Sequence, residues 1–214
     1  MTVENLVESP CAPAAEILES NTSGWSAQCR DLHCAPHFGA FVRAPDSVGG
    51  DASRLVIYGV VSHIETEPFD AGRRPLALWT SEDEMSAKHP QISRLLRTIF
   101  RVRAVGWHRG DAENISQSLP PQPPRMHSFT LACSPDETRH FSLQTDWLRF
   151  LLDGANGESC GDELIVAACR EAVRAHNNER NYTLKLGQAL AVSLRGDYHR
   201  LRAILARIEV VGGQ

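Results

Sequence analysis

Apolar and polar residues alternate along much of the chain between residues 37 and 132, which is the pattern of β-strands with one buried face. Segments of this kind, rich in β-branched and aromatic residues, lie at residues 38–43, 54–65, 75–79, 98–107 and 126–133. In the fourth segment Val102 lies between Arg101 and Arg103, as expected for a strand with one hydrated face. These short segments predict a small closed antiparallel β-barrel.

The inward positions of the predicted strands form the expected core of this barrel. We expect the core to contain Phe41, Ile57, Val61 and Val102. Gly59, inside the second segment, predicts a bulge or a sharp bend of that strand. Ser81 followed by Glu84 indicates the start of a short helix inserted between strands.

The last third of the chain has the apolar spacing and the end signals of helices. Ser134 as a cap, Pro135 at the first helical position and Glu137 at the third predict a helix start. Further helices are expected over residues 146–154 and 160–176. The second of these has acidic residues at its beginning and basic residues at its end, which the helix dipole favours.

A row of apolar and small residues in alternating steps of three and four runs through the C-terminal part of the chain. Its members are Leu184, Gly187, Ala191, Leu194, Tyr198, Leu201, Leu205 and Ile208. This seam predicts one long helix, buried against the helix at residues 161–176 or against a second subunit. Glycine is a weak helix former, so two helices that meet near Gly196 and Asp197 are the alternative.

Three regions follow from these patterns. Residues 1–36 are expected to form an acidic N-terminal arm, with a short helix in the segment AAEILES. Residues 37–132 are expected to form the β-barrel, and residues 133–214 an α-helical domain. The predicted fold class is α+β, a small antiparallel barrel followed by helices.

Composition agrees with a folded globular protein and changes little in this picture. The chain has 214 residues, a net charge of −4, 42% hydrophobic residues and 22% charged residues. No apolar run reaches the roughly 20 residues of a membrane helix. The N-terminal residues lack the basic and apolar parts of a secretory signal. We therefore expect a cytoplasmic protein without membrane association, whose six cysteines are free thiols.

One short segment has the residue types of a metal site. Cys29, His33, Cys34 and His37 offer four possible zinc ligands within nine residues. The segment has no second ligand pair and no CxxC knuckle, so we expect no metal there, although the sequence leaves this point open. No HExxH, GxSxG or phosphate-binding loop occurs in the chain. The sequence therefore indicates no catalytic residue and no cofactor.

Basic residues outnumber acidic ones after Arg170. Arg195, His199 and Arg202 are spaced four and three apart, so on one helix they share a face. The simpler interpretation of this face is a solvated outer face opposite the apolar seam. The functional alternative is a docking patch for an acidic partner or for the acidic N-terminal arm of a neighbouring subunit. Contact with nucleic acid is a weaker interpretation, because the overall charge of the chain is negative.

Two short motifs in the strand region resemble a known domain. Gly59-Val60-Val61 after the strand at residues 38–43, and Val105-Gly106 at the end of a later strand, are similar to the HAS barrel. This is the domain shared by HerA-type DNA-translocating ATPases and ATP synthase subunits. The resemblance covers about residues 37–132 and implies a barrel. It does not extend to the nucleotide-binding domain of the ATPases, whose motifs are missing here.

A barrel that lacks the ATPase domain and is followed by helices predicts a non-enzymatic interaction or assembly module. Such a module is expected to form a homo-oligomer or to bind a protein partner. A nucleic-acid-processing accessory protein is the alternative, with Trp79, Trp107 and Phe100 as possible stacking residues. An enzyme of unrecognised type is a further alternative.

Overall fold

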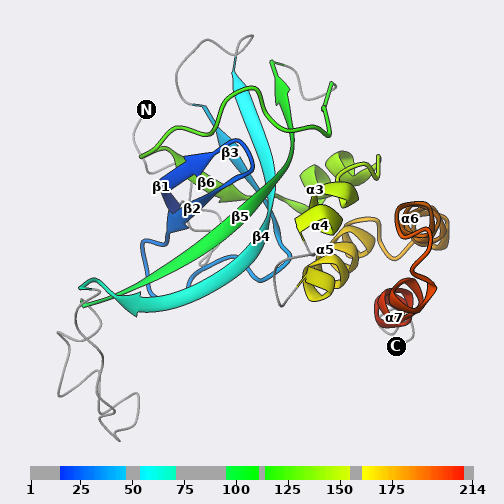
Figure 1. Ribbon diagram of the computed structural model, residues 1–214. Coiled ribbons are helices and arrows are strands. Elements are labelled where there is room, and N and C mark those ends of the chain that lie inside the picture. Colours follow the sequence, from blue (N-terminus) through cyan, green and yellow to red (C-terminus); the bar gives the residue numbers. More distant parts are fainter. Residues whose placement is uncertain (1–14, 47–53, 71–94, 111–113, 155–160, 210–214) are drawn as a thin grey trace, which may run out of the picture.

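The computed structural model describes residues 15–46, 54–70, 95–110, 114–154 and 161–209 (Figure 1). In this part of the chain a closed antiparallel barrel has the strand order β1-β2-β5-β4-β3-β6. The strands are β1 (Ala15–Asn21), β2 (Gly24–Gln28), β3 (Phe41–Pro45), β4 (Leu55–Pro68), β5 (Leu96–Arg109) and β6 (Phe129–Ala132).

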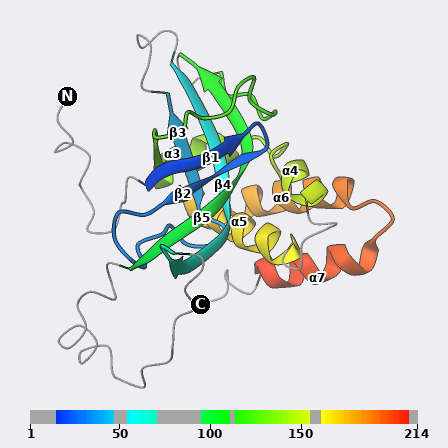
Figure 2. The same cartoon turned by 60° about the vertical axis from the view of Figure 1, so that its left-hand side comes forward.

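Helices follow the barrel in sequence and lie together on one side of it (Figures 1 and 2). They are α3 (Pro135–Ser142), α4 (Leu148–Gly154), α5 (Gly161–Ala175), α6 (Arg180–Ser193) and α7 (Tyr198–Glu209). The predicted α+β fold, an antiparallel barrel followed by a helical region, is therefore confirmed. No described helix is long and apolar enough to cross a membrane.

The barrel begins earlier than the sequence suggested. β1 pairs with β2 and β6, so the prediction of an N-terminal arm is wrong for residues 15–28, and the AAEILES segment forms a strand and no helix from Ala15 onward. Ala15 and Ile17 are buried while Glu16 and Glu19 are exposed, so the acidic residues occupy the outer face of a strand. Residues 1–14 lie outside the described part of the chain.

Alternation along the strands places one set of side chains inside the barrel. Ile57, Val61 and Val102 belong to this interior cluster, together with the fully buried Phe100. Phe41 is buried as predicted, but on the outer side, where its ring lies edge-on to Trp147 at a centroid distance of 5.3 Å. Its neighbours in β3 point inward, so the two-residue period of the strand turns Phe41 toward the helices.

A second core joins the outer face of the barrel to the helices. The strands contribute Phe41, Tyr58, Val60 and Val105, and α4 contributes Leu148 and Leu151. The helix starting at Pro135 has the predicted capping box, because the Ser134 side chain accepts from the Glu137 N–H and the Glu137 carboxylate accepts from the Ser134 N–H.

The C-terminal seam does not form one helix. α6 and α7 are separated by a turn in which Gly196 has a φ of +97°, so the prediction of a single helix is wrong and the alternative break near Gly196 and Asp197 is confirmed. The buried row of α6 is Tyr182, Leu186 and Leu190. The seam residues Leu184 and Tyr198 are exposed, because the turn gives each helix a buried face of its own.

Other predicted elements fall partly outside the described residues. The strand at residues 75–79 and the helix start at Ser81 lie in the undescribed segment 71–94. β5 begins at Leu96, before the start of the strand predicted at residues 98–107, and Arg97 and Thr98 pair with β4. Residues 119–124 form neither a helix nor a strand.

Candidate functional site

The two central strands of the barrel are much longer than their neighbours. β4 and β5 have 14 residues each, whereas β1, the longest other described strand, has seven. Past the pair Val61–Val102 they continue as a ribbon that projects from the barrel (Figure 1). β2 still pairs with β5 as far as Ile99, and beyond that residue the ribbon has two strands. The last paired residues of this ribbon are Pro68 and Leu96. An isolated two-stranded ribbon is marginally stable in water, so its side chains matter for its stability.

A β-bulge marks the start of the ribbon. The register shifts between Val61 and His63, which leaves Ser62 as the extra residue, and its hydroxyl donates to the Arg101 carbonyl oxygen. A bulge turns the strand and re-aims the side chains that follow it. As a result His63 and Glu65 lie on one face of the ribbon, and Ile64 lies on the other.

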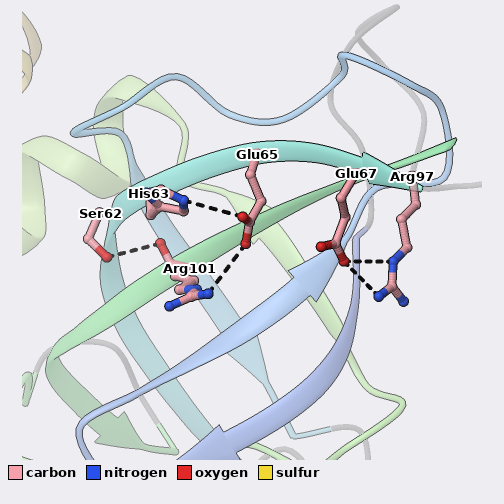
Figure 3. Close-up of polar contacts among 6 residues, drawn as sticks. All are labelled: Ser62, His63, Glu65, Glu67, Arg97 and Arg101. Carbon is pink, nitrogen blue, oxygen red and sulfur yellow. Dashed lines mark hydrogen bonds and ion pairs between the residues drawn. The ribbon is translucent and has the colours of Figure 1, made fainter. Parts of the chain in front are cut away.

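One face of the ribbon has two rows of opposite charge, which we call the ribbon face (Figure 3). It consists of His63, Glu65 and Glu67 on β4 and of Arg97 and Arg101 on β5. Arg97 Nη2 lies 2.6 Å from Glu67 Oε1, and Arg101 Nη2 lies 3.4 Å from Glu65 Oε1. His63 Nε2 lies 3.6 Å from the other oxygen of Glu65. The acids therefore occupy one strand and the arginines the other.

The tip of the ribbon is apolar and exposed. The Phe69 N–H donates to the Leu95 carbonyl oxygen at 2.9 Å, which continues the pairing beyond the strand ends. Phe69 is 53% exposed and Leu95 is 47% exposed, so these side chains form no part of a core within the described chain. The guanidinium of Arg97 lies 5.6 Å from the centre of the Phe69 ring, which places the apolar tip beside the ribbon face.

The opposite face of the ribbon is partly covered by the segment that links β2 to β3. The His33 N–H donates to Thr98 Oγ1, which lies 3.0 Å from Thr66 Oγ1. Cys29 continues β2 by donating its N–H to the Thr98 carbonyl oxygen. The ribbon thus has one face attached to the protein and one face, the ribbon face, turned outward.

The candidate zinc ligands separate in the structure. His37 Nε2 lies 3.2 Å from Glu171 Oε2 of α5, and His33 faces the ribbon threonines. Cys29 is buried, and this burial, with smaller effects of Cys34 and Asp31, raises its pKa to about 11. No three His, Cys, Asp or Glu side chains in the described part of the chain are placed to hold one metal ion.

The predicted docking patch has a different geometry from the one expected. Arg195 lies in the turn before α7, so it does not share a helix face with His199 and Arg202, which are on the first turns of α7. All three side chains are exposed. A role in binding an acidic partner stays a prediction for these residues.

Two neighbouring arginines of the same region serve the fold instead. Arg200 Nε lies 2.8 Å from Asp162 Oδ1, and Arg207 forms an ion pair with Glu163, so both side chains join α7 to the first turn of α5. Part of the basic surplus seen in the sequence is therefore neutralised by acids that are distant in sequence.

Sequence reasoning missed the ribbon face because it ended the strands too early. The signal was present in the sequence, since Glu65 and Glu67 alternate with Ile64 and Thr66. Arg97 and Arg101 are four residues apart on the partner strand, so they share a face. The pairing register that brings the two rows together follows only from the bulge.

Comparison of the chain with protein-family models and with curated proteins finds no match. The candidate site therefore has to be interpreted from its own geometry.

Proposed function

We propose that this protein is a non-enzymatic assembly module that associates with a second copy of itself through the ribbon face. The observation that carries the proposal is the division of a projecting ribbon into an acidic row, Glu65 and Glu67, and a basic row, Arg97 and Arg101. A surface with both rows is complementary in charge to itself.

Symmetry shows how two copies fit. A two-fold axis parallel to the ribbon, in the plane between two facing copies, sets the acidic strand of each copy over the basic strand of the other. An axis across the ribbon sets like charges opposite each other, which is destabilising. The charge pattern thus selects one arrangement of a two-fold dimer, the commonest form of soluble oligomer.

The charges provide specificity more than affinity. Exposed ion pairs contribute about 0–1 kcal/mol each, and charge complementarity mainly selects the partner and speeds association. The favourable free energy of association has to come mostly from burial of apolar surface, at about 25 cal/mol per Å². Phe69 and Leu95 at the exposed tip supply such surface beside the charged rows.

Sedimentation of the purified protein over a range of concentrations tests the proposal. We expect the wild-type chain to form a dimer, and the variant Glu65→Lys with Glu67→Lys, whose ribbon face is entirely basic, to be monomeric. The matched control changes two exposed acids of the helical region, Asp146→Lys with Asp153→Lys, and is expected to dimerise like the wild type. A wild-type protein that stays monomeric at the highest concentration contradicts the proposal.

The nucleic-acid alternative loses part of its support. Phe100 is fully buried inside the barrel, and the Trp107 indole N–H donates to Ser118 Oγ at 3.0 Å. Neither is an exposed stacking platform of the kind that binds single strands. Trp79 lies outside the described residues. The relation to the HAS barrel stays a proposal, because a closed six-stranded barrel is not specific to that family.

A further inference from the structure

The ribbon face contains one histidine, His63, at the barrel end of its acidic row. Histidine is the residue type that changes its charge between about pH 5 and 8, whereas carboxylates and guanidinium groups keep their charge in this range. The His63 side chain is 53% exposed, so its imidazole is open to proton exchange with solvent. The charge of the ribbon face can therefore change with pH at this position.

The position of His63 is set by the bulge at Ser62 and by pairing with Arg101 of β5. Glu65 lies beside both side chains, because His63 Nε2 is 3.6 Å from one of its carboxylate oxygens and Arg101 Nη2 is 3.4 Å from the other (Figure 3). Arg103 is the next charged residue along β5. A protonated His63 therefore shares this single carboxylate with Arg101, whereas a neutral His63 leaves the carboxylate to Arg101 alone.

In the proposed dimer, on which this inference rests, the two-fold axis runs parallel to the ribbon. Rotation about this axis exchanges the positions of the two strands but keeps the height of each residue along the ribbon. Each residue of β4 therefore faces, on the other copy, the β5 residue with which it pairs in its own chain. Because Glu67 pairs with Arg97, it faces the partner subunit's Arg97, and the contact is attractive. Because His63 pairs with Arg101, it faces the partner subunit's Arg101.

Protonation of His63 changes the sign of this last contact. A neutral imidazole accepts a hydrogen bond from a guanidinium N–H group, whereas an imidazolium opposite a guanidinium is a like-charge pair, which is destabilising. The two-fold axis repeats the contact. Protonation also gives each ribbon face a net positive charge, because its two glutamates balance only its two arginines. The separated copies therefore bind this proton more readily than the dimer does, so a lower pH favours separation.

We propose that His63 is a pH-sensitive switch of self-association. The dimer forms while the imidazole is neutral, and it dissociates as the pH falls and the imidazole takes up a proton. The sign of the effect follows from the contact with Arg101, since a protonated His63 that met only a carboxylate of the partner subunit would strengthen association instead.

Sedimentation of the full chain at about pH 8 and about pH 5.5 measures the effect, with circular dichroism to show that the protein is folded at both pH values. For the wild type we expect the dissociation constant to rise about threefold to tenfold at the lower pH, because each dimer contains two like-charge contacts. His63→Gln keeps a hydrogen-bond acceptor but does not titrate, so its dissociation constant should change much less. His63→Arg, which has a permanent charge, should weaken the dimer at both pH values.

His127→Gln is the matched control, because His127 is also an exposed histidine beside a glutamate, 2.7 Å from Glu16, but lies outside the ribbon. This variant should keep the pH dependence of the wild type. A wild-type dimer that is tighter at the lower pH, or one that His63→Gln does not make less sensitive to pH, overturns the role of His63 and leaves self-association intact. A wild type that is monomeric at the higher pH contradicts self-association itself, and the switch with it.

Discussion

His176 is buried where the ends of α3 and α5 meet. Its Nε2 lies 3.0 Å from the Ser142 hydroxyl, and its ring stacks on Tyr182 at a centroid distance of 3.5 Å. The Tyr182 hydroxyl in turn donates to the Ser142 carbonyl oxygen. These contacts join three helices around one imidazole, so the protonation state of that imidazole affects the packing of the helical region.

Burial lowers the pKa of His176 below its ordinary value of 6.5, and the charges of Arg139 and Lys185 act in the same direction, while Glu179 opposes them. The unfolded chain therefore takes up this proton at a higher pH than the folded chain. The stability due to neutral His176 is complete above pH 6.5 and is lost as the pH falls through the lowered pKa.

Urea unfolding at about pH 8 and about pH 5 checks this prediction. We expect the wild type to lose more stability between the two pH values than His176→Gln, which has no titrating group at this position. An equal loss in the two proteins means that His176 does not contribute to the pH dependence.

Gly59 occupies a position where the strands β4 and β5 come close to Trp25. A Cβ atom there would lie 2.3 Å from Val102 Cγ1 and 2.8 Å from the Arg103 carbonyl oxygen. We expect Gly59→Ala to destabilise the barrel by about 1–3 kcal/mol through overpacking. In contrast, Gly187→Ala on α6 meets no atom closer than 3.7 Å and should stabilise the helix by about 0.5–1 kcal/mol. Thermal unfolding of both variants measures this difference in sign.

The residues of the C-terminal seam differ in burial. Ile204 is 1% exposed on α7, whereas Leu201 is only partly buried. We expect Ile204→Ala to cost about 2–5 kcal/mol and Leu201→Ala to cost clearly less. Chemical denaturation of both variants gives the comparison, and an equal or larger cost at Leu201 would show that the seam predicted from the sequence is the one that packs.

The elements also show how far sequence patterns reach. Strands with clear alternation, such as 54–65 and 98–107, and helices with strong end signals, such as the one starting after Ser134, were predicted at nearly the right places. β1 was missed because its glutamates resemble those of a solvated arm, and only pairing with β2 and β6 defines it as a strand. The prediction of one long C-terminal helix was wrong, because apolar residues spaced three and four apart do not reveal which helix face is buried on each side of Gly196.

The ribbon face could not be derived from the sequence, because it depends on long-range pairing. It needs the register that sets Glu67 opposite Arg97, about 30 residues away in the chain. This pair has no local motif, so a single sequence contains no signal that connects the two residues.

The barrel and the helices of the whole molecule share one core, which contains Trp147. Trp147 is fully buried and edge-on to Phe41, and its backbone N–H donates to the Gln117 side chain at 2.9 Å. Gln117 also donates to the Phe141 carbonyl oxygen, so the segment after β5 is tied to both α3 and α4. The two regions are thus expected to unfold together.

We predict that Trp147→Ala destabilises the whole protein by about 3–5 kcal/mol, because it removes a large side chain from this shared core. Wild-type unfolding followed by strand and helix signals in circular dichroism should show coincident transitions. A helical region that melts separately, with a barrel unaffected by Trp147→Ala, would contradict a shared core.

Mixing two variants is the most direct test of whether the ribbon face is complementary to itself. Glu65→Lys with Glu67→Lys makes both rows basic, and Arg97→Glu with Arg101→Glu makes both rows acidic. We predict that each variant sediments as a monomer and that an equimolar mixture forms a one-to-one dimer, because opposite rows then face each other again. A mixture that remains monomeric, or variants that dimerise alone as well as the wild type does, would contradict the claim.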